Sequence, residues 1–241
     1  MKDATSRARQ KLIFALDVPD IPSAIPLLKT LADEIGLVKI GLELFTREGP
    51  AVVAEARRLG LECFLDLKLH DIPATVERAV RNAATLGVRM LTVHTGGGEA
   101  MLRHAAEAAQ DVEVLGVTLL TSLGPEDLTP VGLVSDMNDV VRRRALLARS
   151  CGLGGLVTSA QEVGWIRKLV GPDMTLVVPG IRPSGADTGD QKRIATPFDA
   201  IRSGADYLVV GRPIRDADDP REAARAVVSE IERALSPAGR L

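Results

Sequence analysis

The segment from Phe64 to Thr75 places ionisable side chains where a buried parallel strand is normally apolar. Side chains on a strand alternate between its two faces, so Asp66, Lys68 and His70 share one face and leucines occupy the other. An ionised carboxylate or ammonium is costly to bury unless it is paired. The pattern therefore predicts an ion network that lines a cavity. An edge strand with one solvated face is the alternative.

Two further charged residues extend this pattern. Lys39 lies on the preceding predicted strand, and Asp71 follows the charged strand directly. With Asp66 and Lys68 they predict an alternating array of carboxylates and ammonium groups, whose mutual pairing keeps all four ionised and couples their titrations. Such an array is suited to acid–base chemistry and to stabilising a developing charge. A purely structural ion network is the competing interpretation.

A second candidate site lies near the C-terminus, in the glycine-containing run Gly204–Ile214. Glycine allows a backbone to approach an anion closely, and Gly211 with Arg212 could hold a phosphate through N–H groups and a guanidinium. A tight turn that needs glycine is the alternative. The polar run Arg182–Arg193 is typical of a lid over a ligand, although a surface loop has the same composition.

The remaining motifs indicate no cofactor. The three histidines, His70, His94 and His104, and the two cysteines, Cys63 and Cys151, lack the spacing of metal ligands. We interpret His70 and His94 as hydrogen-bonded side chains and the glycines at 96–98 as structural. No dinucleotide-binding or Walker motif occurs.

The elements that must position these residues alternate regularly along the chain. Eight short, β-branched apolar runs are each followed by a segment with helical periodicity. This pattern predicts an α/β fold, a (β/α)8 TIM barrel that forms a single domain over residues 1–241. A doubly wound open sheet is the second possibility. The predicted strands are 12–18, 37–44, 61–69, 90–95, 112–120, 155–160, 174–181 and 207–214.

Polar residues gather at the C-terminal ends of these predicted strands, where TIM barrels place their active sites. We expect Lys39 and Glu43 to share a face of the second strand, and Gly211 and Arg212 to interrupt the eighth. The other strands contribute Asp17, Asp66, Lys68, His94, Thr121, Ser122, Ser159 and Arg182.

The composition argues against a nucleic-acid-binding or membrane-spanning protein. The formal net charge is −2 and aromatic residues make up 2% of the chain, so neither a basic field nor a stacking platform favours nucleic-acid binding. No apolar run is long enough for a membrane span or a signal sequence. We expect a soluble, unprocessed, cytoplasmic protein with reduced cysteines.

Six short sequence segments together closely resemble the motifs of the orotidine 5'-phosphate decarboxylase family. They occur in the same order as in the family and extend over nearly the whole chain. The resemblance implies conversion of orotidylate to uridylate and carbon dioxide, in de novo pyrimidine synthesis, without metal or organic cofactor. It also implies a homodimer. The segments are Ala15–Asp17, Val38–Gly41, Phe64–Pro73, Val117–Ser122, Pro179–Pro183 and Val210–Ile214.

The same resemblance assigns roles to individual residues. It implies a catalytic set of Lys68, Asp66, Asp71 and Lys39, with Lys68 as proton donor and Asp66 near the scissile carboxylate. Asp71 and Thr75 would reach the partner subunit's site. The implied substrate-binding residues are Asp17 and Lys39 at the ribose, Ile72 and Thr75, Thr121 or Ser122 at the pyrimidine, Gln191 between base and phosphate, and Arg182, Gly211 and Arg212 at the phosphate.

Two other functions remain open at this stage. Related sugar-phosphate lyases and decarboxylases use a similar charged strand but need a divalent cation. A non-catalytic phosphate-binding barrel is the other possibility, and the joint presence of Lys39, Asp66, Lys68 and Asp71 argues against it.

Overall fold

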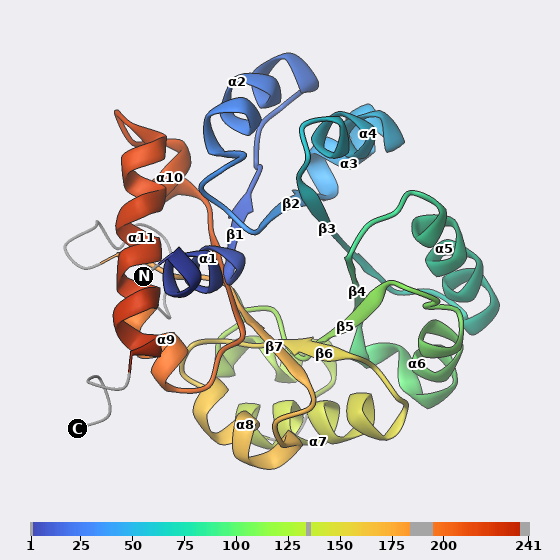
Figure 1. The fold of residues 1–241 in the computed structure, drawn as a ribbon. Coiled ribbons are helices and arrows are strands. Elements are labelled where there is room, and N and C mark those ends of the chain that lie inside the picture. The colour runs from blue at the N-terminus through green and yellow to red at the C-terminus, as the bar shows by residue number, and fades with distance from the viewer. Residues whose placement is uncertain (1, 134–135, 184–194, 237–241) are drawn as a thin grey trace.

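The computed structural model describes residues 2–133, 136–183 and 195–236. Eight parallel strands follow one another in chain order around a closed barrel, and the last pairs with the first (Figure 1). The predicted (β/α)8 barrel is therefore confirmed, and the open-sheet alternative is wrong. The strands are β1 (Leu12–Ala15), β2 (Leu37–Gly41), β3 (Glu62–Leu69), β4 (Met90–His94), β5 (Glu113–Val117), β6 (Gly155–Val157), β7 (Thr175–Val178) and β8 (Tyr207–Val210).

Helices surround the barrel, and most of them connect one strand to the next (Figure 1). None of the helices in the described part of the chain is long and apolar enough to cross a bilayer. The α-helices are α1 (Lys2–Gln10), α2 (Ile21–Leu31), α3 (Leu42–Glu48), α4 (Pro50–Arg58), α5 (Pro73–Thr85), α6 (Gly98–Glu107), α7 (Met137–Ser150), α8 (Val163–Val170), α9 (Pro197–Arg202), α10 (Arg212–Arg215) and α11 (Pro220–Leu235). Short 3₁₀ turns are η1 (Thr95–Gly97), η2 (Pro125–Asp127) and η3 (Thr129–Val131).

Seven of the eight strands end earlier than predicted, by one to four residues, and in β2 and β8 this moves a predicted residue into a helix. β2 stops at Gly41, so Glu43 lies in α3 and does not share a strand face with Lys39. β8 stops at Val210, and Arg212 begins α10 instead of interrupting the strand. At the end of β2, Leu42 and Leu44 continue the apolar periodicity of the strand and conceal the junction. In α10 the fixed φ of Pro213 favours a first helical turn.

The N-terminal helix α1 was not predicted. It lies across the end of the barrel where the strands begin, beside α11 (Figure 1). Its Ala8 is fully buried. A nine-residue helix is marginal in isolation, so this one depends on packing contacts that a sequence pattern does not reveal.

An apolar cluster fills the interior of the barrel, with most strands contributing to it. Its members are Ile13, Ala15, Leu37, Phe64, Met90, Leu115, Val177 and Val209. Alternation along the strands means that the residue two positions beyond each member also faces inward. Polar groups two residues beyond this cluster therefore form the next layer, toward the C-terminal ends of the strands.

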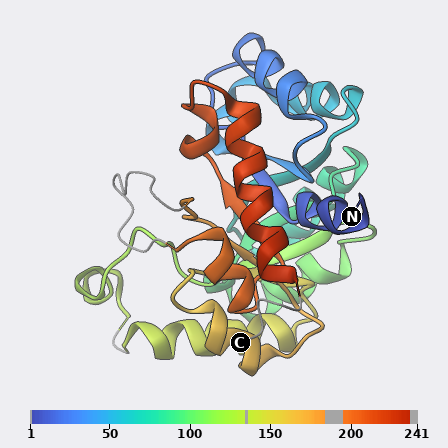
Figure 2. The same ribbon diagram turned by 60° about the vertical axis from the view of Figure 1, so that its left-hand side comes forward.

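The connection between β5 and α7, which carries η2 and η3, projects away from this end of the barrel (Figure 2). It includes the exposed Val131 and ends in a helix start capped by Asp136. Together with the connection from β7 to α9, it is one of two long connections at this end, where binding residues often lie on loops.

We predict that two glycine-to-alanine substitutions change stability in opposite directions. In Gly155→Ala, the new Cβ would collide with the Thr175 backbone carbonyl and lie 2.7 Å from Leu115 Cδ2, so the free energy of unfolding should fall by about 1–3 kcal/mol. In Gly164→Ala, within α8, the nearest non-helix atom is 3.8 Å away, so stability should rise by about 0.4–1 kcal/mol. Urea unfolding measures the free energy of unfolding of both variants. Equal changes in the two variants would contradict the packing described for Gly155 and Gly164.

Candidate active site

Four charged side chains form a continuous row at the C-terminal ends of β1, β2 and β3. Asp17 Oδ1 lies 3.2 Å from Lys39 Nζ. Lys39 Nζ lies 3.6 Å from Asp66 Oδ2, which accepts a hydrogen bond from Lys68 Nζ at 2.8 Å. We call Asp17, Lys39, Asp66 and Lys68 the ion row. Its signs alternate, so each ammonium is next to a carboxylate.

The strand pattern explains why these residues meet. Lys39 and Asp66 follow the interior residues Leu37 and Phe64 by two positions, and Asp17 follows Ala15 in the same way. They occupy one layer directly above the apolar cluster. The apolar cluster keeps water away from the underside of the ion row, which strengthens its electrostatic interactions.

Asp66 is the most buried member, with 9% of its surface exposed. Burial alone raises the pKa of Asp66. The charges of Lys39 and Lys68, together with hydrogen bonds from Lys68 and Thr92, outweigh burial and hold this pKa below its ordinary value. Asp66 is therefore an ionised carboxylate at neutral pH.

The fully buried Thr92 on β4 also contacts the ion row, and the sequence analysis did not identify it. Its hydroxyl donates to Asp66 Oδ1 at 2.9 Å and accepts from the Lys68 backbone N–H at 2.9 Å. A signal was available, because Thr92 follows the interior Met90 by two residues and so faces inward. Threonine is common in strands, so its presence alone does not predict a functional role for Thr92.

The backbone of Lys68 has an unusual conformation. Its φ is +51°, in the left-handed region that non-glycine residues rarely adopt. The pairing of β3 with β4 shifts register between Leu65 and Leu69, which marks an irregularity around this residue. Strain of this kind is typical of functional positions.

Asp71, Ile72 and Thr75 follow β3, and among the residues that the structure describes none of them forms an ion pair or side-chain hydrogen bond with the ion row. Asp71 is exposed, and its Oδ1 accepts the Ile72 backbone N–H at 2.6 Å. Ile72 is 66% exposed, and Thr75, in the first turn of α5, is half-buried. Within the described residues, no ion pair joins Asp71 to the ion row. The structure thus does not bring Asp71 into the predicted four-member array of one chain, and Asp17 takes that place.

The predicted phosphate residues lie at the same end of the barrel. Gly211 precedes α10, and a Cβ on it would lie 3.7 Å from Asp17 Oδ2, so this turn is next to the ion row. Arg215 on α10 donates to the Asp17 carbonyl oxygen at 2.7 Å. Arg182, after β7, is buried, whereas Arg212 is exposed.

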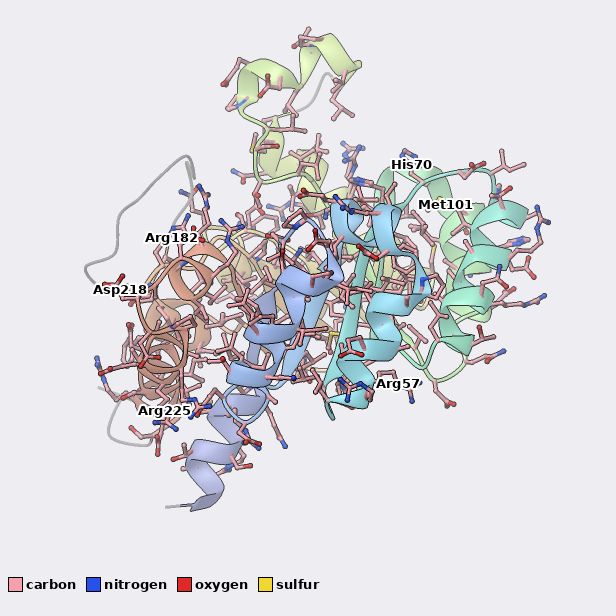
Figure 3. The ribbon with its side chains drawn as sticks, turned by 90° about the horizontal axis from the view of Figure 1, so that it is seen from above. Arg57, His70, Met101, Arg182, Asp218 and Arg225 are labelled. Carbon is pink, nitrogen blue, oxygen red and sulfur yellow. The ribbon has the colours of Figure 1, made fainter. Side chains whose placement is uncertain are left out.

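Figure 3 places Arg182 and His70 toward the end of the molecule where the strands terminate, opposite Arg57 and Arg225. Thr121 and Ser122 follow β5 on the projecting connection, half-buried and exposed respectively. Gln191 and most of the predicted lid, 184–193, lie outside the described residues.

Two histidines and an arginine lie beside the ion row. The rings of His70 and His94 have centroids 5.7 Å apart, and Arg144 donates to the Thr118 carbonyl oxygen at 2.8 Å. Burial, followed by the positive charges of His70, Lys68 and Arg144, lowers the pKa of His94, and Asp66 only partly opposes this. A neutral His94 is therefore favoured in the folded state.

No three metal-ligating side chains of the His, Cys, Asp or Glu type group together in the described ranges. Both oxygens of Asp66 already accept hydrogen bonds, from Lys68 and from Thr92. The glycines at 96–98 form η1 and the start of α6, and a Cβ on Gly97 would collide with Met101. The close contact with Met101 supports the structural interpretation of Gly97.

Comparison with known proteins gives a consistent result. A model of the Orotidine 5'-phosphate decarboxylase / HUMPS family matches residues 10–227. An Anaeromyxobacter sp. (strain K) protein named orotidine 5'-phosphate decarboxylase is 52% identical, covering 92% of this chain and 98% of its own. A protein of that name from Syntrophotalea carbinolica is 50% identical, covering 95% and 97%. The crystal structure of orotidine 5'-phosphate decarboxylase from Lactobacillus acidophilus matches with a TM-score of 0.83 and 34% identity, covering 91% and 98%.

We predict that His94 makes the protein less stable in mild acid. The unfolded chain binds a proton at His94 near its ordinary pKa of about 6.5, while the folded chain resists protonation. Below that pH the unfolded state binds more protons, so the free energy of unfolding falls as pH decreases. Urea unfolding from about pH 7.5 to pH 5.5 measures this fall. His94→Gln should make it shallower, and an unchanged slope would contradict the prediction.

Proposed function

The chain belongs to the orotidine 5'-phosphate decarboxylase / HUMPS family, and from this premise we infer that it converts orotidine 5'-phosphate to uridine 5'-phosphate and carbon dioxide in pyrimidine biosynthesis. The observation that carries this inference is the ion row, with Lys68 Nζ 2.8 Å from a buried, ionised Asp66. We also propose that the chain acts as one barrel domain in the cytoplasm, where the free Cys63 and Cys151 would stay reduced.

Decarboxylation at C6 of the pyrimidine presents a specific electrostatic problem. When the bond to the carboxylate breaks, the electron pair stays on C6 in the plane of the ring, where the π system cannot delocalise it. A preorganised positive charge must therefore stabilise it. We propose that the Lys68 ammonium does so and then transfers a proton to C6, which leaves a neutral amine and a new C6–H bond.

Asp66 would act on the same step from the other side. Next to the scissile carboxylate, its negative charge would repel the substrate but not the neutral carbon dioxide that departs. This role requires Asp66 to be ionised before substrate binds, and its lowered pKa supports that requirement. Lys39, between Asp17 and Asp66, would keep both carboxylates in place while the ribose hydroxyls bind to Asp17 and Lys39.

The phosphate would bind at the other edge of the same opening. We propose that Arg182, Gly211 and Arg212 hold it, since Gly211 lies next to Asp17 and α10 begins at Arg212. Thr121 or Ser122 would contact the pyrimidine from the projecting connection, and Gln191 would link base and phosphate. Binding energy from the distant phosphate would then align C6 with Lys68.

A homodimer would complete the site. We propose that Asp71, Ile72 and Thr75 cross a two-fold interface to the partner's ion row. Two features support this: Asp71 is unconnected to its own row in the described part of the chain, and Ile72 exposes 66% of an apolar side chain beside it. An apolar residue this exposed is typical of a surface that becomes covered.

We predict that activity does not depend on a metal ion. Purified protein treated with a chelator should consume orotidine 5'-phosphate at the rate of untreated protein, because the proposed chemistry uses only side chains. Loss of orotidylate absorbance and release of carbon dioxide measure the reaction. Metal-dependent turnover, or turnover of a ketose phosphate instead, would favour the sugar-phosphate lyases and decarboxylases.

Replacing the proposed proton donor should remove turnover but not binding. In Lys68→Ala, kcat should fall by at least about a thousandfold, while the affinity for uridine 5'-phosphate stays measurable, because the ammonium acts mainly on the transition state. Lys168→Ala, on the exposed face of α8, is the matched control and should behave as the parent. Turnover of Lys68→Ala within about tenfold of the parent would remove Lys68 from this role.

Mixing two inactive variants tests the shared site. Lys68→Ala and Asp71→Ala should each be inactive, but a hybrid dimer carries both lesions in one site and leaves the other intact. Random exchange of an equal mixture makes half of the dimers hybrids, so about a quarter of the parental activity should return. Differently tagged chains establish that subunits have exchanged. If exchanged mixtures stay inactive, Asp71 acts within its own subunit.

A further inference from the structure

Thr92 touches two members of the ion row through a single hydroxyl, yet it has no part in the proposed chemistry. We propose that Thr92 is a positioning residue that sets both the backbone conformation of Lys68 and the orientation of the Asp66 carboxylate. This inference rests on the proposed function, because it concerns the efficiency of the same decarboxylation.

The first contact explains how the strained backbone of Lys68 is held. The register shift between β3 and β4 interrupts regular strand pairing between Leu65 and Leu69. The Lys68 N–H, inside this interruption, donates to Thr92 Oγ1 at 2.9 Å. A side chain thus replaces the backbone acceptor that a regular strand would offer, and the left-handed φ of +51° remains compatible with a satisfied N–H.

The second contact fixes the carboxylate. Thr92 donates to Asp66 Oδ1 at 2.9 Å, while Asp66 Oδ2 faces the two ammonium groups, at 2.8 Å from Lys68 and 3.6 Å from Lys39. The two oxygens therefore have different partners, and rotation of the carboxylate would break both arrangements. Thr92 thereby keeps Asp66 Oδ2 turned toward Lys68.

The two hydrogen bonds also depend on each other. A hydroxyl has one proton, and here that proton is directed to Asp66, so a lone pair remains for the Lys68 N–H. Donation to an anion strengthens the hydroxyl as an acceptor. Thr92 is fully buried and its branched side chain is stiff about χ1, so water does not readily take its place.

Three variants test the proposal. Thr92→Val keeps the shape and removes the hydroxyl, whereas Thr92→Ser keeps the hydroxyl. Thr95→Val is the matched control, since it removes another buried hydroxyl of the same region, one that donates to the Val117 carbonyl at 2.8 Å and does not touch the ion row. The measurements are kcat, affinity for uridine 5'-phosphate and the pH dependence of kcat.

We expect kcat of Thr92→Val to fall by about 30-fold or more, with product affinity within about threefold of the parent. The acid limb of its pH profile should move to higher pH, because Asp66 loses a donor that lowers its pKa. Thr92→Ser should recover most of the rate, and Thr95→Val should match the parent in both rate and profile. If Thr92→Val does not fold, Thr92→Ala takes its place in the same comparison.

Several results would overturn the proposal: a hydroxyl-free variant as active as the parent, an unmoved acid limb, no recovery in Thr92→Ser, or a loss of product affinity that matches the loss of rate. The activity of the parent chain separates the two claims. An inactive parent defeats the proposed function and this inference with it, whereas an active parent with an unaffected Thr92→Val defeats the positioning role alone.

Discussion

A carboxylate buried between two ammonium groups is the interaction on which the rest of the site depends. Removing Asp66 from water opposes its ionisation, and Lys39 and Lys68 more than compensate. A buried pair with one partner removed is strongly destabilised, because the remaining charge has no counterpart. The two ammonium groups therefore keep Asp66 ionised before a ligand arrives.

The barrel holds these charged side chains in fixed positions. Lys39 and Asp66 come from adjacent, rigid strands, and the apolar cluster beneath them excludes water. Rigid elements hold charges in place more effectively than loops do, so little reorganisation is needed when charge develops on a substrate. Lys68 departs from regular strand geometry, and Thr92 Oγ1 accepts the hydrogen bond of its backbone N–H.

The order of the strands and the inward facing of the charged side chains could be predicted from the sequence, because side chains alternate between the two faces of a strand. The eight strand starts were predicted to within about two residues, and the facing of Lys39, Asp66 and Asp17 follows from a period of two. All strand ends except that of β3 were predicted one to four residues too late. At β2, for example, the apolar pattern of Leu42–Leu44 fits a strand and a short helix equally well. Helix α1 depends on tertiary packing, and the Lys68 irregularity depends on a neighbouring strand, so neither leaves a local signal.

The ionisation of Asp66 is the most direct test of this account. Carboxyl NMR of protein labelled with ¹³C-aspartate, with Asp66→Asn to assign the signal, follows protonation as the pH is lowered. The account predicts that the midpoint for protonation of Asp66 in the folded protein lies below its ordinary pKa of about 3.9. A midpoint at or above that value in the folded protein would show that burial outweighs the two lysines, and would contradict the central claim.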